Sequence, residues 1–327
     1  MTSHEKPAVI CNASSQHLTD KVCSILGIEP VQRIIKCQND GESYTRLMES
    51  LIGKDVFIIA STNQPEQNIR QAKDLLRAAY EATATNGSIT LLIPYHGYGR
   101  QDRPVKDREV VSLVEHVREI CNTIPASQLQ VVLFDLHADA ATEACYRTHH
   151  VRCQHIFTSG VMVEQVIENV DVKNLVAFSP DMGGVKRTKK YAEMLGVGFG
   201  MCYKVRSKPG VVDEMYVLGN VDGKDVIIID DMIDTGGSIV KCADYLIAKG
   251  ARKIYVCATH AVLSNNAIAV LQDSRIEKVF ITDTISHPEL SRFSKFCVVS
   301  VADLISEVIL KLHSHDSIAQ YRFRENN

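Results

Sequence analysis

The sequence of 327 residues lacks tryptophan, which excludes no function, and it lacks any long apolar run. Its longest apolar runs are short, as in Val226–Ile229, whereas a membrane span needs about 20 apolar residues. Residues 1–7 are polar and do not form the apolar core of a secretory signal. We therefore expect a cytoplasmic protein with no membrane partner.

Excess charge of one sign is also missing. The chain has 36 Lys and Arg against 39 Asp and Glu, so its formal net charge is only −3. A chain so close to neutral is not a nucleic-acid binder held by bulk positive charge, and we expect no nucleic-acid partner. The length suits two domains of about 100–200 residues each.

The ten cysteines show neither a CxxC pair nor even clustering, which argues against a disulfide framework. Several lie in apolar runs, such as Cys257 within residues 254–258. In a chain of this length without a secretory signal, we expect reduced and mostly buried thiols.

Short Val- and Ile-rich runs alternate with longer amphipathic stretches. Continuous apolar strands are typical of strands covered on both faces, so this alternation predicts an α/β fold with mainly parallel sheets flanked by helices. The predicted strands are 8–11, 34–37, 56–60, 89–94, 131–136, 175–179, 200–204, 226–230, 253–259 and 278–282. The predicted helices are 66–84, 109–122, 159–169, 184–195 and 237–249, with another after residue 300.

The strongest local pattern is VIIIDDMIDTGGS at residues 226–238. It predicts a buried strand that ends in Asp230 and Asp231, followed by a tight loop that opens a helix. Ligands bind at the carboxyl ends of parallel strands, and a glycine loop at a helix N-terminus lets backbone N–H groups converge on an anion. The adjacent carboxylates suit sugar hydroxyls or a metal. The alternative is a solvated turn with an N-cap residue.

Rival motifs fail on spacing. No GxxxxGK[ST] phosphate loop is present. A haloacid-dehalogenase-type pattern would need an aspartate at Met232. Gly196, Gly198 and Gly200 imitate a dinucleotide loop, but the last glycine of that motif would fall on Met201.

Further stretches accompany this loop along most of the chain. They are NDGES (39–43), GKDVFIIAST (53–62), YHGYGRQDR (95–103), DLHA (135–138), SPDMGGVKR (179–187), GKDVIIIDDMIDTGGS (223–238) and ATHAVLS (258–264). The loop resembles that of type I phosphoribosyltransferases, whereas the whole set resembles only the phosphoribosyl pyrophosphate synthetases, or ribose-phosphate pyrophosphokinases. The resemblance implies transfer of pyrophosphate from ATP to the C1 hydroxyl of ribose 5-phosphate, giving phosphoribosyl pyrophosphate and AMP for nucleotide biosynthesis.

The resemblance also implies two similar domains of the phosphoribosyltransferase type. The N-terminal, ATP-side domain would span residues 1–155, and the segment 305–327 would pack back on it. The ribose 5-phosphate-binding domain would span residues 156–304. Without the resemblance, the sequence places a boundary only near residues 145–158.

Residue roles follow from the same resemblance. The ribose 5-phosphate site would comprise Asp230, Asp231, Asp234, Thr235, Gly236, Gly237 and Ser238. The ATP site would comprise Asp40, Glu42, Arg100, Gln101, Arg103 and His137. Mg²⁺ would be held by His137 and Asp181, and the catalytic cations would be Lys204 and Arg206.

Several of these residues have simpler interpretations when taken alone. His137 could be a hydrogen-bonded core histidine, the turn at 100–103 a solvated basic loop, and Lys204 with Arg206 ordinary surface charge. The basic run at 186–190 has no role in the resemblance, and we interpret it as a solvated helix face.

The resemblance implies an oligomer because the acidic loop of Asp40 and Glu42 belongs to the adenine pocket of a neighbouring subunit in that family. A dimer-based homo-oligomer is expected, a hexamer being one arrangement, with the active site near a subunit interface. Gln38 replaces an aromatic residue that stacks on adenine in the family.

Residues 104–107, Asp139, Ala140 and Thr142 depart from the segments that bind regulatory phosphate and ADP in the family. An aspartate at 139 repels phosphate, so we expect altered regulation by phosphate and ADP. Two other functions stay open: a non-catalytic subunit that regulates active relatives, and a phosphoribosyltransferase. Retention of Lys204 and Arg206 argues against the first, and the extra segment 100–103 argues against the second.

Overall fold

The computed structural model describes residues 6–83, 88–205 and 214–322. The chain divides into two compact units, each of which is described by itself. Unit 1 comprises Met1–Thr158, Thr284–Ser286 and Ser300–Asn327, and unit 2 comprises Ser159–Asp283 and His287–Val299. The C-terminal helix thus belongs to the same unit as the N-terminal strand.

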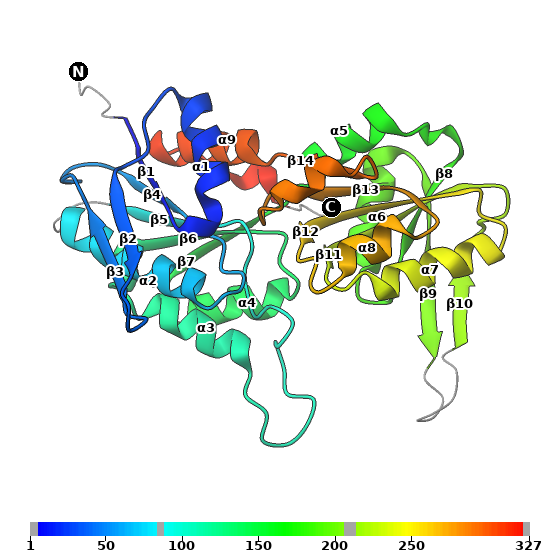
Figure 1. Cartoon of the computed structure of the whole chain (residues 1–327), viewed down its shortest axis with the longest axis horizontal. Coiled ribbons are helices and arrows are strands. Elements are labelled where there is room, and N and C mark those ends of the chain that lie inside the picture. Colours follow the sequence, from blue (N-terminus) through cyan, green and yellow to red (C-terminus); the bar gives the residue numbers. More distant parts are fainter. Residues whose placement is uncertain (1–5, 84–87, 206–213, 323–327) are drawn as a thin grey trace. The chain divides into compact units, whose positions relative to one another are not determined.

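A five-stranded parallel sheet forms the centre of unit 1 (Figure 1). Its strands, in spatial order, are β1 (Ala8–Cys11), β4 (Val56–Ile59), β5 (Ile89–Ile93), β6 (Leu129–Phe134) and β7 (Arg152–Ile156). Its helices are α1 (Gln16–Leu26), α2 (Gln67–Thr83), α3 (Ser112–Cys121), α4 (Asp139–Thr148) and α9 (Ala302–His313). A separate antiparallel hairpin joins β2 (Arg33–Cys37) to β3 (Ser43–Leu47).

Side chains on both faces of this sheet are buried, which explains its apolar strands. In β4, Val56 and Ile58 belong to a core that α2 and α3 complete with Leu75 and Val117. The next residue along, Phe57, is buried on the opposite face. Helices α1 and α9 contact each other, and Figure 1 shows them together on one side of the strands.

Unit 2 is built on a seven-stranded sheet, parallel except for its first pair. The strands, in spatial order, are β10 (Glu214–Leu218), β9 (Gly198–Val205), β8 (Leu175–Ser179), β11 (Asp225–Ile233), β12 (Lys253–Ala261), β13 (Ile276–Thr282) and β14 (Phe296–Val299). The helices are α5 (Ser159–Asn169), α6 (Val185–Leu195), α7 (Gly237–Ala248) and α8 (Ala267–Gln272).

Strand β11 separates two apolar cores in unit 2. Val226 and Ile228 pack with residues of α7 and α8, whereas Ile227 and Ile229 pack with residues of α5 and α6. The unbroken run VIII is therefore required by a strand that is covered on both sides. The predicted fold class, α/β with mainly parallel sheets flanked by helices, is confirmed.

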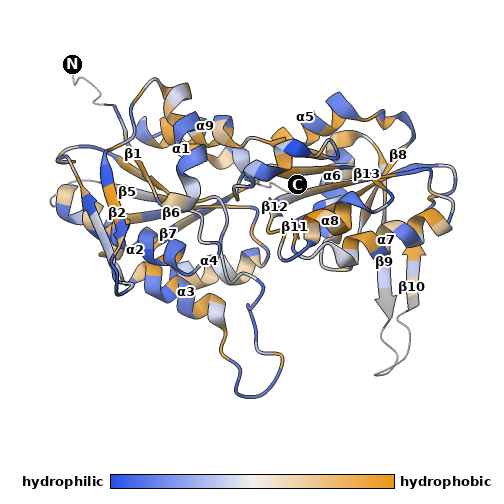
Figure 2. Cartoon of the chain, viewed as in Figure 1, coloured by the Kyte–Doolittle hydropathy of each residue, from blue (hydrophilic) through white to orange (hydrophobic). Residues whose placement is uncertain are grey.

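Apolar residues concentrate along the strands of each unit, while the helices carry both hydrophilic and hydrophobic residues (Figure 2). All ten cysteines are free thiols, and most are buried, as predicted. Over the part of the chain that the structure describes, we find no helix whose length and apolar content would allow it to cross a membrane.

Candidate functional site

Two adjacent carboxylates lie near the carboxyl end of β11. The strand continues to Ile233, beyond the predicted end at residue 230, so both aspartates lie within it, and Asp230 is paired with Ala258 of β12. Asp231 is only 4% exposed and Asp230 is half-buried. The extended backbone directs successive side chains to opposite sides, which keeps the two carboxylates at one end of the strand but at different depths.

Arg187 neutralises part of this negative charge. Its Nη1 lies 3.4 Å from Oδ1 of Asp231, and its side chain is 16% exposed. The backbone N–H of Asp231 donates a 2.9 Å hydrogen bond to Oδ1 of Asp230. Burial and the neighbouring charge of Asp231 nevertheless raise the pKa of Asp230 well above its usual range.

The loop after β11 has a shape fixed by its neighbours. Gly236 adopts a left-handed conformation (φ +76°) at the N-terminus of α7, and a Cβ at this position would lie 3.2 Å from Leu271. The N–H groups of Leu263 and Ser264 donate to the carbonyl groups of residues 233 and 234. The exposed side chains of Thr235 and Ser238 flank this helix end. Backbone N–H groups of the first helical turn are available to an anion here.

Asp181 follows β8, the parallel neighbour of β11. It is exposed, and its Oδ1 accepts a 3.1 Å hydrogen bond from the N–H of Gly184 at the start of α6. A Cβ on Gly184 would lie 2.7 Å from Oγ of Ser179 and 3.8 Å from the carbonyl oxygen of Ile229. The loop that carries Asp181 is thus packed beside the end of β11.

In unit 1, the basic turn after β5 lies close to His137. Arg100, Gln101 and Arg103 are exposed on this turn. A Cβ on Gly99 would lie 3.5 Å from Cβ of His137. Two stretches far apart in the sequence therefore meet at the carboxyl ends of β5 and β6.

His137 is held by the turn that ends β6. Asp135 is buried with a left-handed backbone (φ +40°), and its Oδ2 accepts hydrogen bonds from the N–H (2.8 Å) and hydroxyl (2.6 Å) of Thr158. The N–H of Leu136 donates to Nε2 of His155 at 3.0 Å. These bonds turn the chain outward, and His137 is exposed. The interpretation as a core histidine is therefore wrong.

Asp40 and Glu42 lie at the exposed tip of the β2–β3 hairpin. The N–H of Glu42 donates to Oδ1 of Asp40 at 3.0 Å, which fixes the tip. Gln67, the first residue of α2, donates a side-chain hydrogen bond to the sulfur of Cys37 at the base of the tip. Glu66, the residue before it, accepts a hydrogen bond from Tyr98 in the basic turn. The start of α2 thus contacts both elements.

Lys204 lies near the carboxyl end of β9, opposite Met215 of β10. Strand β9 runs parallel to β8, and Met201 is already level with Ser179, the last residue of β8. The backbone of Lys204 is thus at the same end of the sheet as Asp181 and Asp230. The side chain of Lys204 and all of Arg206 lie outside the described residues.

Comparison with known proteins decides the family. The model of the N-terminal domain of ribose phosphate pyrophosphokinase matches residues 8–122, and the phosphoribosyl synthetase-associated domain matches residues 201–324. The ribose-phosphate pyrophosphokinase of Porphyromonas gingivalis is 35% identical over 97% of this chain and 98% of its own length. That of Thermotoga maritima is 33% identical over 98% and 99%. The chain belongs to the ribose-phosphate pyrophosphokinase family.

A solved structure supports this ribose-phosphate pyrophosphokinase fold. The phosphoribosylpyrophosphate synthetase from Mycobacterium smegmatis superposes with a TM-score of 0.86 and 26% identity, covering 95% of this chain and 100% of the other. The family and enzyme class predicted from the sequence are therefore confirmed.

Arg187 is a residue of this ribose-phosphate pyrophosphokinase that sequence reasoning placed wrongly. The basic run at 186–190 was expected on a solvated face, but Arg187 is half-buried and paired with Asp231. The helical spacing of the sequence indicates that Arg187 faces inward, because residue 187 is three positions after Gly184 and four before the buried Tyr191. It therefore lies on the inward-facing stripe of α6.

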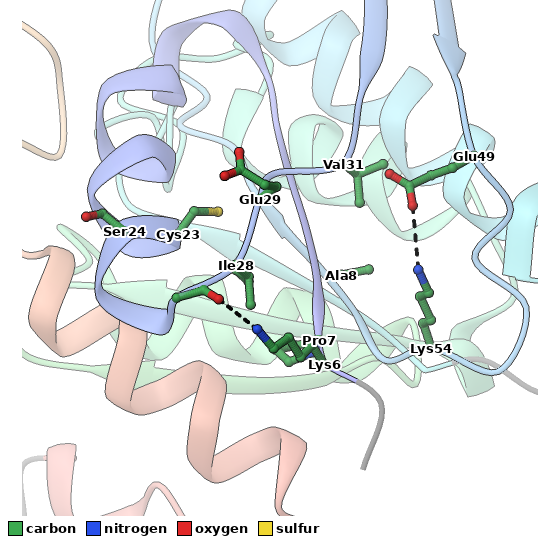
Figure 3. A pocket seen from close by; sticks show the side chains of 11 residues that line it. Lys6, Pro7, Ala8, Cys23, Ser24, Ile28, Glu29, Val31, Glu49 and Lys54 are labelled. Carbon is green, nitrogen blue, oxygen red and sulfur yellow. Dashed lines mark hydrogen bonds and ion pairs between the residues drawn. The ribbon is translucent and has the colours of Figure 1, made fainter. Parts of the chain in front are cut away.

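A pocket of about 430 Å³ lies elsewhere, at the amino end of β1 (Figure 3). Lys6 donates to the carbonyl oxygen of Gly27 at 2.8 Å, and Lys54 is paired with Glu49 at 3.5 Å. Both cations are thus engaged by neighbouring protein groups, and the pocket is lined by none of the site residues expected for the ribose-phosphate pyrophosphokinase.

Proposed function

We propose that the chain transfers pyrophosphate from ATP to the C1 hydroxyl of ribose 5-phosphate, forming phosphoribosyl pyrophosphate and releasing AMP for nucleotide biosynthesis. The observation that carries this proposal is the end of β11. There, two carboxylates for a sugar are followed at once by a glycine loop and a helix N-terminus for a phosphate.

Ribose 5-phosphate binding is assigned to unit 2. Asp230 and Asp231 accept hydrogen bonds from ribose hydroxyls, and Arg187 lies beside Asp231 as its ion-pair partner. The 5-phosphate is bound by the loop of Asp234, Thr235, Gly236, Gly237 and Ser238. This makes residues 156–304 the ribose 5-phosphate-binding domain.

ATP binding is assigned to the domain of residues 1–155, together with the segment 305–327. Guanidinium groups match phosphate oxygens in a bidentate manner, and Arg100 and Arg103 are exposed on one short turn with Gln101 between them. His137 lies beside that turn. Asp40 and Glu42 complete the nucleotide site of a neighbouring subunit, so we propose a dimer-based homo-oligomer, a hexamer being one arrangement.

Mg²⁺ is the proposed cofactor, with Asp181 and His137 as its protein ligands. Among the described residues, no group of three or more His, Cys, Asp or Glu side chains could hold a metal. Mg²⁺ typically uses one or two protein side chains and takes its other ligands from water and substrate phosphates. When bound, Mg²⁺ neutralises charge on the phosphates.

Lys204 and Arg206 are proposed as the catalytic cations. In-line displacement at phosphorus places extra negative charge on the transferred group, and cations positioned for it stabilise the transition state. We propose that the reaction takes place in the cytoplasm, a proposal that the free thiols support.

The test is direct. The purified chain, incubated with ribose 5-phosphate, ATP and Mg²⁺, is expected to release AMP and form phosphoribosyl pyrophosphate, and EDTA is expected to stop the reaction. AMP release only after a second subunit is added would instead support a regulatory role. Consumption of phosphoribosyl pyrophosphate with a nucleobase, without AMP release, would support a phosphoribosyltransferase.

Arg100→Ala is expected to raise the KM for ATP by about tenfold or more, because a charge-assisted hydrogen bond to phosphate contributes about 1.5–3 kcal/mol. The KM for ribose 5-phosphate should change by less than about twofold, since that substrate binds unit 2. Arg118→Ala, on an exposed position of α3, is the matched control. Equal effects of both variants would contradict the assignment of Arg100.

Regulation by phosphate and ADP is expected to be altered. Asp139 is exposed at the start of α4, and its Oδ1 accepts a 2.7 Å hydrogen bond from the N–H of Ala140. The carboxylate of Asp139 thus occupies the N-terminus of α4, and its negative charge repels an incoming phosphate. Activity should change by less than about twofold between low and high phosphate, whereas Asp139→Ser should increase the response. A steep phosphate requirement with strong ADP inhibition in the unmodified enzyme would contradict this expectation.

A further inference from the structure

Four polar side chains are buried beneath the basic turn at residues 97–103, and each is at most 5% exposed. They are Thr62, His96, His116 and Tyr146, and they come from four different segments of unit 1. Buried polar groups require hydrogen-bond partners, so their arrangement can be worked out bond by bond.

The hydroxyl of Thr62 contacts three groups. Its Oγ1 lies 2.8 Å from the N–H of Gly97, 3.2 Å from the carbonyl oxygen of Tyr95 and 3.3 Å from Nε2 of His116. A carbonyl oxygen only accepts, so the hydroxyl proton goes to Tyr95. The oxygen of Thr62 then accepts from Gly97 and from His116, which means that Nε2 of His116 carries a proton.

His96 has the opposite arrangement. Its Nδ1 lies 2.9 Å from the carbonyl oxygen of Gly97 and therefore carries the proton. Its Nε2 lies 3.1 Å from the hydroxyl of Tyr146. Burial lowers the pKa of His96 to about 4 and also lowers that of His116, so both rings are neutral near pH 7. Nε2 of His96 thus accepts from Tyr146.

The turn held by these bonds contains a strained residue. Tyr98 has φ +59°, a left-handed conformation that is uncommon outside glycine. Its ring lies against that of His116, with centroids 5.5 Å apart, and its hydroxyl donates to Oε2 of Glu66 at 2.9 Å. Such strain persists only where the surroundings determine the conformation, and here His116 and Glu66 supply that support.

The turn is packed tightly against Thr62 at Gly97. A Cβ on Gly97 would lie only 2.3 Å from the carbonyl oxygen of Thr62, so backbone meets backbone there. One residue beyond Tyr98, Gly99 lies against His137. Arg100 follows directly, which makes its direction a consequence of the bonds beneath residues 97–99.

We propose that His96, His116 and Tyr146 are positioning residues that set the turn at 97–103, and with it the affinity of the enzyme for ATP. They do not touch the nucleotide; they act through Gly97, Tyr98 and Thr62. This inference rests on the proposed function of Arg100, Gln101 and Arg103 as contacts for the ATP phosphates.

The first test removes one oxygen atom. Tyr146→Phe is expected to raise the KM for ATP about fivefold, in line with one lost buried hydrogen bond, while kcat and the KM for ribose 5-phosphate change by less than about twofold. Tyr255→Phe is the control, because Tyr255 is also buried (7% exposed) but lies in unit 2. A lower melting temperature without a change in the KM for ATP would show a merely structural role and overturn the proposal.

A matched pair of variants tests His116. Glutamine can place an N–H donor near the position of Nε2, whereas methionine has a similar length and no donor. We expect His116→Met to raise the KM for ATP and His116→Gln to recover most of the loss. Equal KM values in the two variants would show that the hydrogen bond to Thr62 does not position the turn.

A spectroscopic readout is independent of activity. Nitrogen-15 chemical shifts at pH 7 should show the proton of His96 on Nδ1 and that of His116 on Nε2. A charged ring, or the same tautomer at both positions, would overturn the hydrogen-bond scheme.

If the unmodified chain releases no AMP while these tautomers are found, the proposed function fails and the scheme stands. If it turns over ATP and Tyr146→Phe has an unchanged KM, the positioning role fails alone.

Discussion

Lys204→Ala is expected to lower kcat about 10²–10³-fold and to leave the KM for ribose 5-phosphate within about twofold, because a transition-state contact is lost and a ground-state contact is not. The backbone of Lys204 is near the carboxyl end of β9, and the adjacent strand β8 ends just before Asp181. A cation placed there would stabilise the negative charge that develops on the transferred group in the transition state.

Steady-state kinetics with both substrates varied would measure this effect, and Lys253→Ala is the matched control. Lys253 is exposed at the amino end of β12, the end of the sheet opposite to the site. If Lys204→Ala weakens binding of ribose 5-phosphate while turnover survives, Lys204 binds substrate and does not act in the transition state.

Asp230→Asn is expected to lower kcat/KM for ribose 5-phosphate about hundredfold and at the same time to stabilise the folded protein. An amide replaces one carboxylate that accepts from ribose hydroxyls, and charge-assisted hydrogen bonds are the stronger kind. The gain in stability has a separate cause, because burial and the charge of Asp231 raise the pKa of Asp230 in the folded state.

The raised pKa of Asp230 determines how its contribution to the stability of the fold depends on pH. A carboxyl whose folded pKa is raised binds its proton more tightly when folded, so its stabilising contribution is full below the unfolded pKa of about 4. It is lost as the pH rises toward the folded pKa. Asparagine does not ionise, so the variant should exceed the parent in melting temperature by a few degrees at pH 7 and by less at pH 4.

Asp231→Asn is the control, because Asp231 is the partner of Arg187 in the half-buried ion pair. Removal of its charge should destabilise the fold at pH 7. Thermal unfolding of the three proteins at both pH values makes the comparison. A lower melting temperature for Asp230→Asn than for the parent at pH 7 would show that Asp230 is stabilising as an anion.

The sequence predicted the central elements because their patterns are local. The apolar run VIII of β11 and the apolar stripe of α7 are patterns that can be recognised within a few consecutive residues. Strand β7 (RCQHI) was missed because its polar side chains serve the neighbouring turn: His155 accepts from Leu136. Strands β3 and β10 were missed because their described side chains alternate between half-buried and exposed, unlike those of the fully buried strands that the sequence predicted.

The features of the candidate site also differ in whether the sequence could predict them. The loop at 234–238 could be predicted because glycine, hydroxyl and carboxylate residues are consecutive. The pairing of Arg187 with Asp231, and the proximity of Gly99 to His137, depend on how distant strands and helices pack. The buried bonds of Thr62, His96 and Tyr146 could not be predicted for the same reason, since three separate segments supply them.

The position of α9 has a consequence for synthesis of the chain. This helix is made last, yet it belongs to the unit of β1 and contacts α1. Nearly all of unit 2 is contiguous and is synthesised before residue 302 is added. Domains fold as units during synthesis, so unit 2 can complete its core while the first-made sheet still waits for its final helix. Unit 1 can therefore be completed only after nearly all of unit 2 has been synthesised.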